Sequence, residues 1–360
     1  MKQNDSEIVL SICIPTYNRR DILKGTLDEI LSYPNDDIEV IVIDNASTDG
    51  TDKMLDNYED FRLKVRRNAL DTGMFSNQLE AVFGGSGKYT VCLMDRDRMY
   101  AGKMQELISF LRRTDVGIIR IEDEVKNCRY KTGGKAAAYV MIRTHPSCLI
   151  YKTALLRSVC DQKHILDVLE SDPDFTYAYT QIVGLLMLNW DNRICLYPNN
   201  DLVRLEVKKV QSYARYKMNI ACIYYMPEGA KRRYLKCIEE IMPVYSKEKI
   251  MEYLPYIFAS ECYRGTRLHY DYSHIRKVSR KYNVKKIGLN EYVSFGIDFY
   301  MAAIEQKRKF KICKAKTGFM MMYVLILYLL EMFILLEVPS KEKWMGKLNN
   351  QLRNTGLMFY

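Results

Sequence analysis

The sequence lacks the patterns that would assign it to several common protein classes. Its four histidines are scattered and no two of its ten cysteines have Cys-x-x-Cys spacing, so a structural zinc site is not expected. An export signal is also missing, because residues 1–7 are polar and contain no apolar core. Many cysteines without an export signal are typical of a reducing compartment, so we expect a cytoplasmic protein.

The first part of the chain has no excess of positive charge. Residues 1–200 contain 25 Lys and Arg against 29 Asp and Glu, whereas residues 201–360 contain 29 against 15. The net charge of +10 is therefore carried by the second part. No motif that reads RNA or DNA accompanies this charge, so nucleic acid is not an expected partner. A chain of 360 residues exceeds one typical domain, and we predict a first domain at 1–200 and a basic helical region at 201–360.

Long apolar runs are also rare, and the longest lies in the basic region. Helical patterns occur at about 205–225, 228–242, 246–264, 270–282, 290–309 and 318–336. Residues 319–336 are apolar apart from Glu331, and basic residues precede them at 307–316. Eighteen residues are short for a membrane span, and a carboxylate is costly in lipid. The pattern favours an in-plane membrane anchor over a span, with a core helix or an oligomer interface as alternatives for 307–337.

Strand and helix patterns alternate through the first part of the chain. The strands are predicted at 9–14, 38–43, 63–65, 89–94, 148–151 and 193–197, with helices at about 21–31 and 74–83. This alternation predicts an α/β fold with a mostly parallel sheet flanked by helices. Polar clusters follow the strands, at the sheet edge where this architecture binds ligands.

Two acidic residues follow the strand predicted at 89–94. Side chains two apart on a strand point the same way, so we expect Asp95 and Asp97 to project together from its carboxyl end. Two carboxylates at such an edge suit Mg²⁺ or Mn²⁺ bound to a substrate diphosphate. A polar loop after a core strand is the alternative.

Four separated motifs resemble family 2 glycosyltransferases of the GT-A (Rossmann-like) fold. They are residues 11–19 (Ser-Ile-Cys-Ile-Pro-Thr-Tyr-Asn-Arg), 42–51 (Val-Ile-Asp-Asn-Ala-Ser-Thr-Asp-Gly-Thr), Asn77 with 87–89, and 95–97. The resemblance spans residues 8 to about 115. It implies transfer of a sugar from a nucleotide diphosphate-sugar to an acceptor hydroxyl, with inversion at the anomeric carbon. It also implies Mn²⁺ or Mg²⁺ on the diphosphate.

The resemblance also implies which residues form the site. Asp44 matches the carboxylate that binds the donor's base, usually uracil, and Asp97 matches the metal ligand. The predicted substrate-binding residues are Pro15, Thr16, Tyr17, Asn18, Asp44, Asn77, Asp95 and Arg96, and the predicted metal ligands are Asp95 and Asp97. Capping of the turn after its strand is the alternative for Asp44, and solvation is the alternative for Arg96. His145 opens a segment on the acceptor side, although a lone histidine is more often structural.

The general base is where the sequence departs from the family. Relatives commonly place a carboxylate near the position of residues 179–181, which are Tyr-Thr-Gln here. We predict Asp172 or Asp174 as the base, although Asp172 before a proline also fits a helix N-cap. A family member without activity, acting as a scaffold for glycan assembly, is the alternative. For an active enzyme we expect a glycan or lipid-linked acceptor, a role in surface polysaccharide synthesis, and a place at the inner face of the cell membrane.

Overall fold

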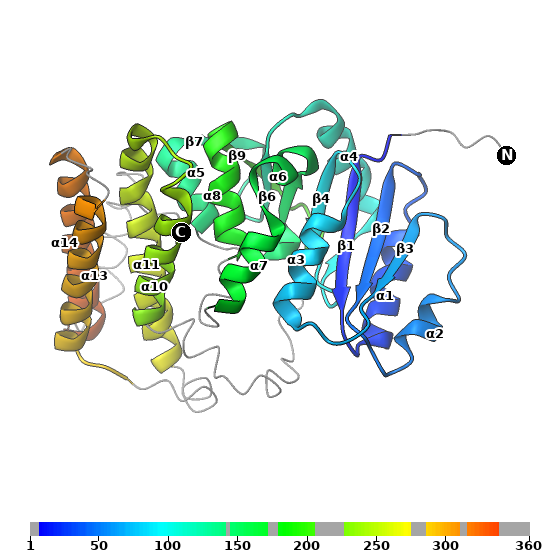
Figure 1. Cartoon of the computed structure of the whole chain (residues 1–360), viewed down its shortest axis with the longest axis horizontal. Helices are drawn as coiled ribbons and strands as arrows, with labels where there is room; N and C mark the ends of the chain where they lie inside the picture. Colours follow the sequence, from blue (N-terminus) through cyan, green and yellow to red (C-terminus); the bar gives the residue numbers. More distant parts are fainter. Residues whose placement is uncertain are drawn as a thin grey trace. The chain divides into compact units, whose positions relative to one another are not determined.

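A computed structural model describes residues 7–141, 145–171, 179–205, 227–274, 286–309 and 315–337. The described residues form two compact units (Figure 1). The first contains residues 7–131, 145–171 and 186–205, and the second contains 132–141, 179–185 and the described residues from 227 onward. The domain boundary that we place at residue 200 remains a prediction.

The second unit is helical in its described residues. Its helices are α5 (Gly133–Met141), the start of α8 (Tyr179–Asp191), α10 (Pro227–Ile241), α11 (Lys247–His274), α13 (Leu289–Lys309) and α14 (Ala315–Glu337). The helices predicted at 228–242, 290–309 and 318–336 are confirmed. The helix predicted at 205–225 lies almost entirely outside the described residues.

The prediction of separate helices at 246–264 and 270–282 was wrong in its described part. The helix α11 continues without a break to His274. Gly265 lies in the expected gap, but one glycine costs a helix only about 1 kcal/mol and does not end it. The remainder of 270–282 lies outside the described residues.

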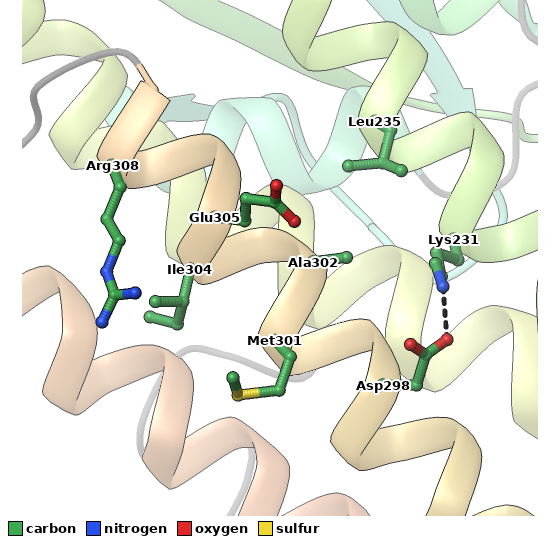
Figure 2. Close-up of a pocket in the computed structure, with 8 residues that line it drawn as sticks. All are labelled: Lys231, Leu235, Asp298, Met301, Ala302, Ile304, Glu305 and Arg308. Carbon is green, nitrogen blue, oxygen red and sulfur yellow. Dashed lines mark hydrogen bonds and ion pairs between the residues drawn. The ribbon is translucent and has the colours of Figure 1, made fainter.

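A surface hollow of about 530 Å³ lies in the second unit between α10 and α13 (Figure 2). It is lined by Lys231, Leu235, Asp298, Met301, Ala302, Ile304, Glu305 and Arg308. Lys231 forms an ion pair with Asp298, and the other two charged side chains offset each other in sign. The lining therefore does not favour a ligand of either charge, and we assign it none.

The first unit is built on a mixed sheet of eight strands. The order is β3-β2-β1-β4-β8-β6-β9-β7. The bounds are β1 (Leu10–Thr16), β2 (Ile38–Asp44), β3 (Leu63–Arg67), β4 (Tyr89–Cys92), β6 (Ile118–Glu122), β7 (Arg129–Thr132), β8 (Leu149–Lys152) and β9 (Arg193–Pro198). β1, β2, β3 and β4 are parallel, β6 and β9 are parallel, and β8 is antiparallel to its neighbours β4 and β6. A separate antiparallel pair joins β5 (Arg98–Met99) to β10 (Val203–Arg204). The predicted fold class is confirmed.

The first strand continues through Pro15, where the sequence suggests a stop. The carbonyl of Cys13 accepts a hydrogen bond from Leu93, which places Cys13, and Pro15 two residues later, on the β4 side of the strand. β4 ends opposite Cys13, so no strand lies beside Pro15 on that side. A proline there costs no hydrogen bond of the sheet. The extension carries Thr16 to a position opposite Asp44.

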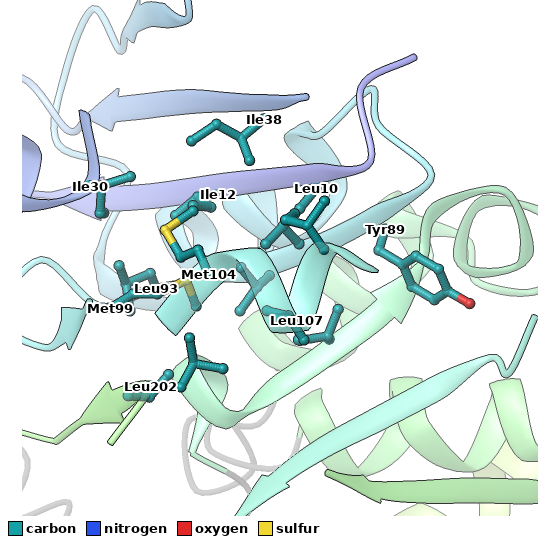
Figure 3. Packing of buried hydrophobic residues seen from close by; sticks show 14 of the residues in the cluster. Leu10, Ile12, Ile30, Ile38, Tyr89, Leu93, Met99, Met104, Leu107 and Leu202 are labelled. Carbon is teal, nitrogen blue, oxygen red and sulfur yellow. The ribbon is translucent and has the colours of Figure 1, made fainter. Parts of the chain in front are cut away.

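Helices cover both faces of this sheet. They are α1 (Arg20–Leu31), α2 (Thr51–Leu55), α3 (Met74–Gly84), α4 (Ala101–Arg113), α6 (Thr153–Val159) and α7 (Gln162–Ser171), and the short η1 (Pro146–Cys148) precedes β8. Leu10 and Ile12 of β1 join Met104 and Leu107 of α4 in one buried cluster (Figure 3). On the opposite face, Cys13 Sγ would lie 3.8 Å from a Cβ added at Gly84, so this face of β1 packs against α3. A strand buried on both faces reads as a nearly continuous apolar run, which is why β1 and β2 are recognisable in the sequence.

Candidate functional site

The carboxyl ends of three neighbouring strands bring the first group of motif residues together. β1 ends at Thr16, β2 ends at Asp44, and the turn after β4 contains Asp95. Thr16 and Asp44 lie opposite each other in the sheet, and Thr16 Oγ1 donates a hydrogen bond to Asp95 Oδ2 at 3.1 Å. Because parallel strands end at one edge, motifs that are far apart in the sequence form one site.

The Asp95 carboxylate is buried and both of its oxygens accept hydrogen bonds. Arg19 Nη1 donates to Oδ1 at 2.7 Å, and Thr16 donates to Oδ2. Burial raises the pKa of Asp95, while the positive charge of Arg19 and the bonds from Arg19 and Thr16 oppose that rise. Asp95 is thus part of a preformed link between the ends of β1 and β4.

Asp97 lies in a different environment. Its Oδ2 accepts a hydrogen bond from Ser147 Oγ at 2.6 Å and lies 3.5 Å from His145 Nδ1. Burial lowers the pKa of His145, which keeps the imidazole neutral at pH 7. The positive charge of Arg96 also lowers this pKa, whereas the negative charge of Asp97 raises it. The strand-alternation argument for this pair was wrong. β4 ends at Cys92, and Asp95 and Asp97 lie in a turn where they have different partners.

Asp44 combines a structural contact with an open one. Its Oδ1 accepts a hydrogen bond from the backbone of Ser47 at 3.1 Å, which is the turn-capping role named as the alternative. Its Oδ2 is buried and has no hydrogen-bond partner among the described residues, with Arg67 Nη1 at 3.6 Å. The Arg67 charge lies near this oxygen, but a buried oxygen without a hydrogen bond is costly, so the atom can still accept a hydrogen bond from a ligand.

Other predicted site residues hold the loops in place. Asn18 has positive φ and accepts a hydrogen bond from Thr48, while the Ser47 hydroxyl accepts one from the Asn18 backbone. These bonds fasten the loop after β1 to the loop after β2. The buried Asn77 amide donates to the carbonyls of Thr16 and Ile43 at 3.4 and 3.2 Å, bridging the two strand ends. The geometry thus gives Asn18 and Asn77 supporting contacts within the protein.

The remaining predicted residues lie at the same edge. Pro15 is buried within β1, and Tyr17 directly follows that strand. Arg96 lies between the two acidic residues, and its Nε is buried without a hydrogen-bond partner among the described residues. A buried guanidinium nitrogen of this kind suits a phosphate ligand.

The implied divalent cation fits this edge only with help from a substrate. Within the described ranges, no three His, Cys, Asp or Glu side chains gather closely enough to hold a metal ion by themselves. Mg²⁺ and similar ions bound with phosphates use one or two carboxylates and take the other ligands from substrate and water. Asp97 is placed for such a contact, whereas both oxygens of Asp95 already accept hydrogen bonds.

The predicted general bases cannot be placed. Asp172 and Asp174 lie outside the described residues. Residues 179–181, where relatives place a carboxylate, are buried at the start of α8. Gln181 Nε2 donates to the carbonyl of Met141 and to Glu261 within the helical unit. Gln181 thus has a packing role there.

Sequence reasoning missed three residues that contact the acidic groups. Arg19 pairs with Asp95, Ser147 donates to Asp97, and Arg67 lies beside Asp44. Arg19 ends the first motif, so its position after the strand was a usable signal. Ser147 and Arg67 come from other segments, and no local pattern marks them.

The mixed sheet with helices on both faces and an acidic turn after β4 is consistent with the GT-A fold that the motif resemblance implies. Residues 11–161 match the family described as "Glycosyl transferase family 2". This match includes all four motifs, so it supports the motif resemblance over this segment of the chain.

Two relatives and one solved structure show how far the likeness extends. "Abequosyltransferase RfbV" of Salmonella typhimurium is 41% identical over 87 residues, which is 23% of this chain and 26% of that protein. "GalNAc(5)-diNAcBac-PP-undecaprenol beta-1,3-glucosyltransferase" of Campylobacter jejuni is 29% identical over 102 residues, 28% of this chain and 33% of that protein. The likeness thus spans about a quarter to a third of each relative. S. aureus TarS 1–349 in complex with UDP-GlcNAc has a TM-score of 0.56 at 18% identity, covering 89% of this chain and 91% of that one. This structural likeness establishes the fold.

Proposed function

We propose that the protein transfers a sugar, with inversion, from a nucleoside diphosphate-sugar to a hydroxyl of a lipid-linked glycan during surface polysaccharide synthesis. The observation that carries this proposal is the meeting of Asp44 and Asp95 at one sheet edge, with Asp97 two residues further on. Of the three carboxylates, Asp44 suits a nucleotide base and Asp97 suits a metal-bound diphosphate. The match of residues 11–161 to glycosyl transferase family 2 supports the same reaction type.

Recognition of the base rests on Asp44. Its Oδ2, which accepts no hydrogen bond from the described residues, would accept one from an N–H group on the edge of the base, and uracil carries such a group. The bonds between Asn18, Ser47 and Thr48 hold the two flanking loops together in advance, so little order is lost on binding. We therefore propose a uridine nucleotide as the donor.

Asp97 would hold Mg²⁺ or Mn²⁺ on the diphosphate, and the Arg96 guanidinium would contact a phosphate oxygen. The cation, when bound, offsets the negative charge that grows on the departing diphosphate. The protein contributes a buried carboxylate oriented by Ser147, together with the buried Nε of Arg96. The general base is proposed to be Asp172 or Asp174, by sequence position alone.

The proposed acceptor is a glycan on a polyprenyl diphosphate, as named for the Campylobacter jejuni relative, at the cytoplasmic face of the membrane. Within the described ranges, none of the helices combines the length and apolar character needed to cross a bilayer. The helix α14 nevertheless exposes a row of apolar residues along one side: Phe319, Met322, Ile326, Leu330 and Phe333. An apolar row in a basic region supports shallow contact with an anionic membrane surface.

Ligand-induced stabilisation tests the donor class. The protein is heated with a panel of nucleotide sugars, each with and without Mn²⁺. A donor present at 100 times its dissociation constant should stabilise the protein by about 2.7 kcal/mol. We expect uridine nucleotides to stabilise it only when Mn²⁺ is present. Equal stabilisation by adenosine nucleotides, or no stabilisation by any, contradicts the proposal.

One observation favours a second candidate, a catalytically inactive family member that acts as a scaffold in glycan assembly. The position where relatives carry a base holds Gln181, which is buried and bonded to Glu261. Hydrolysis of the donor by the purified protein separates the two candidates. Slow release of free sugar supports an enzyme, whereas donor binding without release over hours supports the scaffold.

A further inference from the structure

The two acidic residues of the turn after β4 differ in what they can still bind. Asp95 accepts hydrogen bonds at both oxygens, and one donor is the cationic Arg19 at 2.7 Å. A divalent cation at Asp95 would displace or approach that guanidinium, which like-charge repulsion opposes. Asp95 is therefore poorly placed as a metal ligand.

His145 supplies a ligand atom on the other side of the turn. Its Nδ1 is buried, has no hydrogen-bond partner among the described residues, and lies 3.5 Å from Asp97 Oδ2. That separation is too long for a good hydrogen bond. Adjacent ligands of an octahedral ion, each about 2.1 Å from the metal, are roughly 3 Å apart. Nitrogen and oxygen atoms at this separation can bind one ion after a small adjustment.

The same short segment also orients Asp97. The η1 turn begins directly after His145, with Pro146 at its first position and a backbone bond from Cys148 to the His145 carbonyl at 3.0 Å. Ser147 Oγ donates to Asp97 Oδ2 at 2.6 Å and accepts a bond from the Met94 backbone. One segment therefore brings the imidazole to Asp97 and fixes the carboxylate, as supporting groups do around bound metals.

We propose that His145 and Asp97 are the two protein ligands of the divalent cation, and that Asp95 is a positioning residue that holds Arg19 and Thr16. This inference rests on the proposed function for the identity of the metal and the diphosphate. It adds an N,O ligand pair and removes Asp95 from the ligand set. A structural histidine beside a carboxylate is the alternative that the test must exclude.

The test measures metal binding directly, with Mn²⁺ and UDP as the probes. Paramagnetic resonance gives the affinity for Mn²⁺, and pulsed spectra report coupling between bound Mn²⁺ and a directly bonded imidazole nitrogen. We expect nitrogen coupling in the wild-type protein and its loss in His145→Ala and His145→Gln. Both variants should bind Mn²⁺ at least about 10-fold more weakly. His164→Ala, on the exposed side of α7, is the matched control and should change nothing.

The aspartates complete the design. Asp97→Asn should lose as much Mn²⁺ affinity as His145→Ala, whereas Asp95→Asn should change it less than about 3-fold, a small effect beside the changes at the two ligands. Thermal unfolding without metal shows whether each variant is folded, and the wild-type spectrum tests the ligand even if a variant is not. Absence of nitrogen coupling, coupling that persists in His145→Ala, or a larger loss in Asp95→Asn overturns the inference. Metal binding through His145 without sugar transfer would instead contradict the proposed function alone.

Discussion

The Asp44 carboxylate has one oxygen hydrogen-bonded to the Ser47 backbone and one that accepts no hydrogen bond from the described residues. Replacing Asp44 by Ala should weaken binding of the donor by roughly 1–3 kcal/mol, because the base would lose a buried hydrogen-bond acceptor. The free nucleoside diphosphate should lose as much affinity as the sugar nucleotide, since both contain the base. Calorimetry with UDP measures this effect.

A control for Asp44→Ala is Asp56→Ala, an exposed carboxylate at the end of α2. Its affinity for UDP should equal that of the wild type. Unchanged UDP binding by Asp44→Ala would assign that residue to the turn after β2 alone.

Glu39 gives the first unit a defined sensitivity to acid. Burial alone would raise its pKa, but hydrogen bonds from Lys64, Ser11 and Ser86 outweigh it and lower the pKa of Glu39 to about 2. A carboxylate whose pKa is lowered in the folded state stabilises it above the unfolded-state pKa. That contribution is lost as the pH falls from about 4.5 towards 2.

Substitution of Glu39 by Gln tests this dependence. At pH 7 the free energy of unfolding should fall by about 1–3 kcal/mol, because charged hydrogen bonds are replaced by weaker ones. Between pH 4.5 and 2 the variant should lose less stability than the wild type, as measured by urea unfolding at each pH. Parallel pH profiles for the two proteins would exclude Glu39 as the source.

At the scale of single residues, the sequence predicts the acidic and loop positions better than their contacts. Asp44, Asp95 and Asp97 follow recognisable strands, so the sheet edge was predictable. Their partners Ser147 and Arg67 come from distant segments and depend on the packing. The different environments of Asp95 and Asp97 were unpredictable because they are set by a turn, where strand periodicity does not apply.

At the scale of elements, periodicity was sufficient where it was strong. The strands β1, β2 and β9 and the helices α1 and α3 lie close to their predicted positions. Extension of β1 through Pro15 depended on where β4 ends, and continuity of α11 depended on how little one glycine costs. The end of β4 is set by a distant segment, so the sequence around Pro15 could not show it. The low cost of Gly265 is local to α11, so that error came from treating one glycine as a helix end.

The contact between α13 and α14 gives a prediction at this scale. A Cβ added at Gly296 would lie 2.4 Å from Tyr328 Cε1, and the Tyr328 hydroxyl donates to the Tyr292 carbonyl at 2.9 Å. Gly296→Ala should therefore destabilise the second unit by about 1–3 kcal/mol, despite the better helix propensity of alanine. Thermal unfolding followed by circular dichroism measures the change.

Gly288→Ala is the matched control, because its added Cβ would meet Glu291 at an ordinary 3.7 Å. This variant should remain close to wild-type stability. If Gly296→Ala is as stable as Gly288→Ala, the two helices pack less closely than the structure describes.

At the scale of the whole molecule, the charge and the chemistry lie in different parts of the chain. The candidate donor site lies within the first unit, and the excess of basic residues lies beyond residue 200. The helix α14 has two sides: Met321, Val324 and Tyr328 are buried, whereas Phe319, Ile326 and others are exposed. Removing α14 would destroy a packed face together with the exposed row, so truncation is a poor test of membrane contact.

Substitutions on the exposed side separate membrane contact from folding. Changing Phe319, Ile326 and Phe333 together to Ser should weaken binding to anionic vesicles even at high salt, since apolar burial is insensitive to salt. Changing Lys307 and Arg308 to Glu should weaken binding mainly at low salt, because each basic residue contributes up to about 1 kcal/mol near an anionic surface. Vesicle co-sedimentation measures both effects, and neutral vesicles should show little response to the charge changes.

The control for charge is Lys103→Glu with Arg113→Glu on the exposed side of α4, which makes the same change in net charge within the first unit. This variant should bind anionic vesicles as the wild type does if α14 and its basic flank are the membrane contact. All three variants should keep binding UDP and Mn²⁺, because no substituted residue belongs to the site.

Equal loss of vesicle binding in the α4 control would mean that net charge, and not the α14 surface, attracts the protein to the membrane. If the Ser variant binds vesicles normally but loses self-association in sedimentation analysis, the exposed row of α14 is an interface between copies of the chain, and the membrane assignment is wrong.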